Sequence, residues 1–250
     1  TGGHCYRQSM ECDGADAVRR AVRIQVNKGA DVIKFMGSGG LEHFPHEDPS
    51  IPQFTLEELT AGAEAAHDLG RACAIHAYSN EGIRRAVFAG IDNIEHGCMM
   101  TEDLIEEMAR RGTHLNPTMT GIRGAAKAGP NAKYWDMLQE RVFSKQEQGM
   151  RWAKQAGILI GAGTDTAGTL RDEIAMIGET LGEGPVEALG HALGVNAQIA
   201  GRSDMGLLEV GRLANFAAFD GDLTQSLEGL AHVIQTWKDG KPCKPGPGAQ

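Results

Sequence analysis

The chain has 250 residues, 41% of them apolar, which is enough for one large α/β domain or two smaller ones with a sizeable core. A formal net charge of -9, from 24 basic and 33 acidic residues, argues against a general affinity for nucleic acid or an anionic membrane. The five cysteines form no Cys-x-x-Cys pair and no apolar run reaches the roughly 20 residues that span a bilayer, so a reducing, cytoplasmic location fits.

Predicted helices and strands alternate from residue 14 to about residue 180. The helices are expected at 14–29, 55–70, 80–90, 101–112 and 132–157, and the strands at 31–36, 71–77, 91–96, 113–119 and 158–165. Thr55-Leu-Glu-Glu58 has the Thr-x-x-Glu form of a capping box. Strict alternation indicates parallel strands joined by right-handed crossovers, in either an open doubly wound sheet or a closed eightfold barrel.

The pattern changes after Gly201. Segments 207–220 and 232–241 look like short strands, and Lys238-Asp-Gly-Lys241 is a hairpin signal. This part of the chain is expected to be the edge of a small β domain. No Gly-x-Gly-x-x-Gly follows a strand anywhere in the sequence, which argues against dinucleotide binding.

Four predicted strands carry a chemically useful side chain at or near the end of the strand. These residues are Lys34, His76, His96 and Asp165. Catalytic groups gather at the C-terminal strand ends of barrels and open α/β sheets, and imidazole and carboxylate ligands suit zinc or a similar divalent ion. A lone histidine at a strand end is more often structural, so spacing alone leaves a metal site and a structural role equally open.

Lys34 interrupts an apolar strand. If that strand is buried on both faces, an ammonium there costs several kcal/mol unless it is paired or its charge is altered. The side chain either reaches water from the strand end or has a function.

Several segments together resemble the amidohydrolase superfamily, and in particular its imidazolonepropionase-related, prolidase-type branch. They are Gly29-Ala-Asp-Val-Ile-Lys-Phe-Met-Gly-Ser-Gly-Gly40, Ile75-His-Ala-Tyr78, Gly90-Ile-Asp-Asn-Ile-Glu-His-Gly97, Gly161-Ala-Gly-Thr-Asp165, Gly206-Leu-Leu-Glu-Val-Gly-Arg-Leu-Ala-Asn215 and Val233-Ile-Gln-Thr-Trp-Lys-Asp-Gly240. The motifs are specific in combination and weak singly. The resemblance implies a (β/α)8 barrel that lacks its first strands at residues 1–200, and part of a small C-terminal β-sandwich at 201–250.

The same resemblance implies a centre of two divalent metal ions, with zinc expected. Lys34 matches a lysine that is carboxylated in the family to a carbamate bridging both ions. His76 and His96 match ligands of the second metal, and Asp165 matches a further ligand that is also the general base. Tyr78 matches a tyrosine that hydrogen-bonds the substrate carbonyl oxygen in some members.

The remaining polar residues are given smaller roles. His4 resembles a loop position near the active-site mouth and is a candidate substrate-binding residue beside Tyr78. Glu95 is expected to point toward the helical layer, without a catalytic role. The other histidines, among them His67, His114, His191 and His232, are expected to be structural or on the surface.

The sequence departs from the family pattern in one large respect. The family's first strand supplies a His-x-His pair for the first metal, and no His-x-His occurs in this sequence. Thr1-Gly-Gly-His4 resembles the loop after the third strand. We therefore expect the chain to be N-terminally incomplete.

The expected function is hydrolysis of an amide-type C–N bond by metal-activated hydroxide, in a small amide or dipeptide-like substrate. Hydrolysis of another ester or cyclic amide by the same centre is one alternative. An inactive fragment, or one that needs a partner chain, is the other. The sequence leaves homo-oligomer formation, the metal and the exact substrate open.

Overall fold

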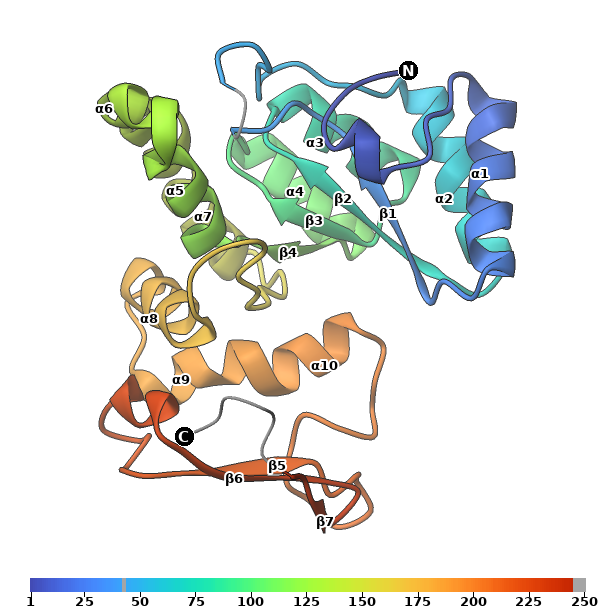
Figure 1. Cartoon of the computed structure of the whole chain (residues 1–250). Coiled ribbons are helices and arrows are strands. Elements are labelled where there is room, and N and C mark those ends of the chain that lie inside the picture. The colour runs from blue at the N-terminus through green and yellow to red at the C-terminus, as the bar shows by residue number, and fades with distance from the viewer. Residues whose placement is uncertain (42–43, 245–250) are drawn as a thin grey trace.

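The computed structural model describes residues 1–41 and 44–244. Residues 42–43 and 245–250, the latter in the predicted β domain, lie outside this range. Two sheets divide the chain: a parallel sheet of four strands in the order β1-β2-β3-β4, and an antiparallel sheet in the order β5-β6-β7. Figure 1 shows the two sheets at opposite ends of the molecule, with helices between them. None of the helices in the described ranges has the length and apolar character to cross a bilayer.

Helices and strands alternate in the first half, as the sequence predicts. In chain order the elements are η1 (Tyr6–Gln8), α1 (Ala15–Asn27), β1 (Val32–Met36), α2 (Leu56–Asp68), β2 (Ala72–Ala77), α3 (Asn80–Ala89), β3 (Asn93–His96), α4 (Glu102–Arg111) and β4 (His114–Asn116). The Thr55 capping box at the start of α2 is confirmed, because Thr55 and Glu58 each accept a hydrogen bond from the other's backbone N–H.

The second half is mostly helical before the antiparallel sheet begins. Its elements are α5 (Met119–Lys127), η2 (Gly129–Tyr134), α6 (Trp135–Leu138), η3 (Gln139–Phe143), α7 (Ser144–Gln155), α8 (Leu170–Leu181), α9 (Pro185–Gly190), η4 (His191–Val195), α10 (Asn196–Ile199), β5 (Phe216–Phe219), η5 (Leu227–Ala231), β6 (Val233–Lys238) and β7 (Lys241–Pro242).

Helices α1 to α4 cover one face of the parallel sheet (Figure 1). Every second strand residue points into the core that they form, including Ile33, Phe35, Ile75 and Ile94. The alternate residues therefore point to the opposite face. On that face the register aligns Met36 with His76, His76 with Glu95, and Glu95 with Asn116.

The predicted fifth strand at 158–165 is wrong as a regular strand. It makes a single parallel bridge, Leu115 with Ile160. Beyond that bridge, Asn196 of α10 pairs with both backbone groups of Ala162, at 3.0 and 2.8 Å, as a neighbouring strand would. A Cβ at Gly161 would lie 2.0 Å from the Asn116 side-chain oxygen and 2.4 Å from that of Asn196. Only glycine permits this close approach.

The predicted strand at 113–119 is also shorter than expected. β4 ends at Asn116, since Pro117 has no N–H to donate and Thr118, with φ 48°, turns the chain into α5. A second buried cluster forms where α5, α6 and η3 meet, and it contains Tyr78, Ile122, Leu138 and Phe143.

The hairpin predicted at Lys238–Lys241 is confirmed between β6 and β7. Asp239 and Gly240 have φ of 52° and 73°, as a tight turn with two left-handed residues requires. Phe216 stacks on Trp237 across β5 and β6 at 4.6 Å.

Candidate metal centre

His76 and His96 meet at the C-terminal ends of β2 and β3. His76 Nδ1 lies 2.8 Å from His96 Nε2, and both residues are almost fully buried. His76 is the next-to-last residue of β2 and lies on the face of the sheet opposite helices α1 to α4, so strand alternation alone turns it toward the site. The two predicted ligands on neighbouring strands are therefore brought together.

His96 reaches the site by a different route. It follows Glu95 and would point toward the helices if the strand simply continued. Its φ of 73° lies in the left-handed region, which only a few per cent of non-glycine residues adopt. This turn brings the ring to His76 and against Tyr78, where the two rings stack at 4.8 Å.

Both imidazoles are held neutral. Burial, with nearby His4, lowers the pKa of His76 to about 3. Burial, with His76 close by, lowers the pKa of His96 well below its usual value. Neutral imidazole is the form that binds a metal ion.

The hydrogen-bond partners of the rings also favour a cation. His76 Nε2 donates to the Gly39 carbonyl at 3.2 Å, which leaves a lone pair on Nδ1. The Thr118 hydroxyl donates to the Pro117 carbonyl at 2.8 Å and can then accept from His96 Nδ1. When His96 carries its proton on Nδ1, His76 Nδ1 and His96 Nε2 face each other and each has a lone pair. A cation bound there would accept both lone pairs. The opposite tautomer of His96 places its proton between the rings.

Lys34 of β1 lies on the same face of the sheet as His76, the face opposite helices α1 to α4, which is called the inner face below. Its side chain keeps contact with solvent, yet protein atoms around the ammonium desolvate it and lower its pKa. The charges of Glu95 and Asp165 oppose this shift. An amine with a lowered pKa has a larger neutral fraction, and that is the form that reacts with electrophiles.

The orientation expected for Glu95 is wrong. Glu95 shares its face of β3 with Asn93, which donates to it at 2.7 Å, and its strongest charged neighbour is Lys34. It therefore lies on the inner face of the sheet and not in the helical layer. Burial raises the pKa of Glu95, and hydrogen bonds from Asn93 and Asn116 oppose the rise. The prediction assumed that Glu95 and His96 point to opposite faces of the sheet, as successive residues of a regular strand do. The positive φ of His96 breaks this alternation, so the side chains of Glu95 and His96 lie on the same side.

Asp165 follows the single bridge at Ile160 and has a φ of 60°. Its side chain is exposed and lies close enough to Lys34 and Glu95 to influence both pKa values. It also approaches α5, where a Cβ on Gly121 would lie 3.1 Å from the Asp165 Cβ. The structure thus places all four predicted ligands at one edge of the sheet, and His76 and His96 lie in direct contact.

The two predicted substrate-binding residues flank the histidines. His4 stacks on His76 at 4.2 Å and pairs through Nδ1 with Glu47 at 2.9 Å. Tyr78 is only 1% exposed, and its backbone N–H donates to the Ser38 hydroxyl. The loop after β1 therefore packs against this site through Ser38, Gly39 and Glu47.

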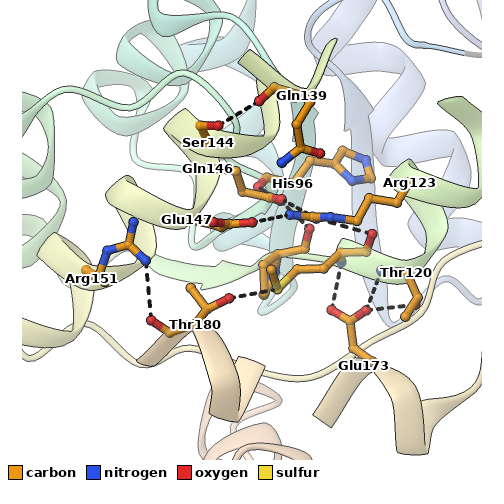
Figure 2. A network of polar contacts seen from close by, with 12 residues as sticks. His96, Thr120, Arg123, Gln139, Ser144, Gln146, Glu147, Arg151, Glu173 and Thr180 are labelled. Carbon is orange, nitrogen blue, oxygen red and sulfur yellow. Dashed lines mark hydrogen bonds and ion pairs between the residues drawn. The ribbon is translucent and has the colours of Figure 1, made fainter. Parts of the chain in front are cut away.

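A buried polar network behind His96 was not predicted (Figure 2). Gln146 of α7 is 0% exposed and donates to the carbonyls of His96 and Pro117, at 2.8 and 2.7 Å. Arg123 of α5 donates to Gln146 at 3.1 Å and to Glu147 at 2.8 Å. The sequence carries no motif for Gln146. Thr118 could have been noticed as one more polar residue just after a strand.

Comparison with known proteins gives a consistent result. The model of the amidohydrolase family matches residues 1–243. Ochratoxinase of Aspergillus niger is 33% identical over 256 residues, which cover 94% of this chain and 51% of that protein. The chain thus spans about half the length of this curated relative.

Solved structures agree with the sequence match. The A. niger ochratoxinase structure has a TM-score of 0.84 at 30% identity, covering 96% of this chain and 56% of that one. A putative prolidase from Bifidobacterium longum has a TM-score of 0.85 at 29% identity, covering 97% and 63%. A Xaa-Pro dipeptidase with methionine bound in its active site has a TM-score of 0.85 at 28% identity, covering 98% and 65%. This chain belongs to the amidohydrolase family.

Proposed function

We propose that this chain forms the catalytic part of a metal-dependent amidohydrolase that cleaves the C–N bond of a small amide or dipeptide-like substrate. The observation that carries the proposal is the pair of buried, neutral histidines that face each other at 2.8 Å beside Lys34 and Asp165. The names of the similar proteins, ochratoxinase and prolidase, agree with hydrolysis of an amide bond.

The proposed architecture is a (β/α)8 barrel. Residues 1–200 would form part of it, and residues 201–250 part of a small β-sandwich. In support, β1 to β4 are parallel and sequential, helices cover one face, and the polar residues gather on the other. In a barrel that second face is the interior, with the active site at the C-terminal strand ends.

We assign the metal ligands as His76, His96, Asp165 and Lys34, with Lys34 carboxylated. Two imidazoles and a carboxylate suit zinc and similar divalent ions. Carboxylation would replace a desolvated ammonium, whose pKa is already lowered, by an anion suited to lie between cations. When bound, the metal supplies a Lewis acid and lowers the pKa of water toward about 7.

The chain's own residues would then divide the remaining work. The exposed Asp165 carboxylate is the group that accepts a proton from water and returns it to the leaving nitrogen. Thr118 and Gln146 hold His96 in its turned position through its ring and its carbonyl. His4 and Tyr78, on either side of the histidines, would bind and orient the substrate.

A second candidate is a chain that needs a partner segment for activity. It is favoured by the absence of His-x-His in the sequence and by the length of the relatives, of which this chain covers about half. In this case the 250-residue protein binds metal but hydrolyses nothing.

Hydrolysis by the purified protein is the direct test of this function. The purified protein, loaded with Zn²⁺, is screened against N-acyl amino acids and Xaa-Pro or Xaa-Arg dipeptides. His96→Asn should lower kcat/KM at least about a thousandfold, because loss of a metal ligand removes the activated water. His232→Asn, which changes an exposed histidine far along the chain, should remain within about twofold of the wild type.

The outcomes separate the two candidates. Hydrolysis that survives in His96→Asn contradicts the assigned centre. No hydrolysis of any substrate, together with a Zn²⁺ content that is lower in His96→Asn than in the wild type, favours the partner-dependent candidate.

A further inference from the structure

A second cluster of potential metal ligands lies at the other end of the parallel sheet. The cluster consists of His67, Cys73 and Asp92, whose ligand atoms all lie within 4.8 Å of one another. Within residues 1–41 and 44–244, no other three His, Cys, Asp or Glu residues meet this criterion. His67 is near the end of α2, Cys73 is at the start of β2, and Asp92 precedes β3. The cluster is at the N-terminal strand ends, so it is distinct from the site at His76 and His96.

The distances between the donor atoms match a tetrahedral zinc site. Zinc bonds of about 2.3 Å to sulfur and about 2.0 Å to nitrogen and oxygen require ligand separations of about 3.6 Å for S–N, 3.5 Å for S–O and 3.3 Å for N–O. Cys73 Sγ lies 3.6 Å from His67 Nε2 and 3.3 Å from Asp92 Oδ2, and His67 Nε2 lies 2.9 Å from Asp92 Oδ2. All three separations are within about 0.4 Å of the tetrahedral values.

The surroundings also suit an ion. The Cys73 backbone N–H donates to Asp92 Oδ2 at 2.8 Å and fixes the carboxylate, as second contacts do in metal sites. Cys73 is 1% exposed, whereas the side chains of His67 and Asp92 are 43% and 42% exposed. An ion can therefore enter between the two exposed ligands and keep a solvent molecule in its fourth position.

A catalytic Cys-His-Asp arrangement does not fit the same geometry. In such a triad the carboxylate bonds the ring nitrogen that faces away from the nucleophile. Here Asp92 and the thiol both face Nε2 of His67. Burial, together with Asp92, also raises the pKa of Cys73 to about 12, so the free thiol is not a nucleophile.

We propose that His67, Cys73 and Asp92 form a separate binding site for a thiophilic divalent cation, of which Zn²⁺ is the representative. On binding, the Cys73 thiol releases its proton to solvent, and the proton of His67 lies on Nδ1. The ion ties α2 to the starts of β2 and β3. The N-terminal face of a barrel serves stability, so the site acts as a structural clip and not in catalysis.

The test uses Co²⁺ added to the metal-free 250-residue protein, because a thiolate–cobalt bond gives a near-ultraviolet charge-transfer band that imidazole and carboxylate ligands do not give. The band should appear in the wild type and vanish in Cys73→Ser. It should persist in Cys98→Ser, which alters a buried cysteine of the other apolar cluster, and in Cys5→Ser, which alters the cysteine near Lys34. A band that survives in Cys73→Ser overturns the proposal.

A second variant guards against misfolding of Cys73→Ser. His67→Gln changes a half-exposed side chain near a helix end and should weaken Zn²⁺ binding at this site at least about tenfold, measured by competition with a chromophoric chelator. Zn²⁺ should raise the Tm of His96→Asn, which keeps the clip, but not that of His67→Gln/His96→Asn. Equal Tm shifts in these two variants, or unchanged Zn²⁺ affinity in His67→Gln, contradict the site.

Discussion

His96, Thr118 and Asp165 have φ angles of 73°, 48° and 60°, in the left-handed region that non-glycine residues seldom adopt. Each such residue costs of order 1–3 kcal/mol and persists only where its surroundings hold it. All three lie at the same edge of the sheet, and two of them are predicted metal ligands. Three of the five non-glycine residues with a positive φ in the described chain therefore lie at this edge of the sheet.

Gln146 donates to the carbonyl of His96 and to that of Pro117, the residue before Thr118. Gln146→Leu should lower the free energy of unfolding by about 3 kcal/mol, because the buried carbonyls of His96 and Pro117 lose their donor. Gln148→Leu, the same change two residues along α7 at a partly exposed position, should stay within about 0.5 kcal/mol. Urea denaturation measures both, and equal stability of the two variants would show that Gln146 does not support the site.

Asp92 links the stability of the protein to pH. Hydrogen bonds from His67 and Cys73 lower its pKa in the folded state below the unfolded value of 3.8, against the effect of burial. Its contribution is therefore fully present above about pH 3.8 and is lost as the pH falls through the lower folded pKa.

Asp92→Asn should accordingly lower the free energy of unfolding by about 1 kcal/mol at pH 7 in the presence of a chelator. The difference from the wild type should shrink below pH 3.8. Asp68→Asn, an exposed carboxyl on α2, serves as the control. A difference that stays constant down to pH 2 would count against the lowered pKa.

At the scale of the elements, the alternation of helices with parallel strands and the strand-end residues followed from periodicity. Apolar residues at every second position and helices between the strands are local properties, so β1 to β4 and α1 to α4 were predictable. The segment at 158–165 was not, since Asn196, more than thirty residues later, takes the place of its strand partner. A contact of that kind has no local signature.

The capping box of α2 should stabilise the protein measurably. Thr55→Ala should lower the free energy of unfolding by about 1 kcal/mol, because the N–H of Glu58 loses its acceptor. Thr60→Ala, in the interior of the same helix, should be neutral or slightly stabilising because alanine is the better helix former. Thermal and urea unfolding can compare them, and a Thr55 variant as stable as the Thr60 variant would contradict the capping role.

At the scale of the whole molecule, the antiparallel sheet and the segment before it expose large apolar side chains. Leu208 is 79% exposed, Val210 107%, Val233 54% and Ile234 66%. Exposed apolar patches and uncovered sheets favour association. We expect this end of the molecule to bind another protein surface, and a second copy of this chain is one that is always present.

Self-association should follow from that surface. The double variant Val210→Ser/Ile234→Thr should weaken concentration-dependent association at least about tenfold, as the loss of about 1.4 kcal/mol of apolar burial implies. Val186→Ser, at a similarly exposed position on α9, should have little effect. Sedimentation velocity over a hundredfold range of concentration measures both, and a wild type that stays monomeric throughout would refute the expectation.

The sequence by itself determined the alternation of strands and helices, the hairpin at 238–241, and the four residues that gather at one sheet edge, because periodicity and parallel topology fix where strand ends lie. Only the tertiary structure decided how those residues point. The left-handed turn at His96 brings Glu95 and His96 to the same side, and Gln146 from a distant helix holds that turn. The tertiary structure also brought His67 and Asp92 to Cys73. His67 and Asp92 are 25 positions apart along the chain, and the alignment of the parallel strands brings them together.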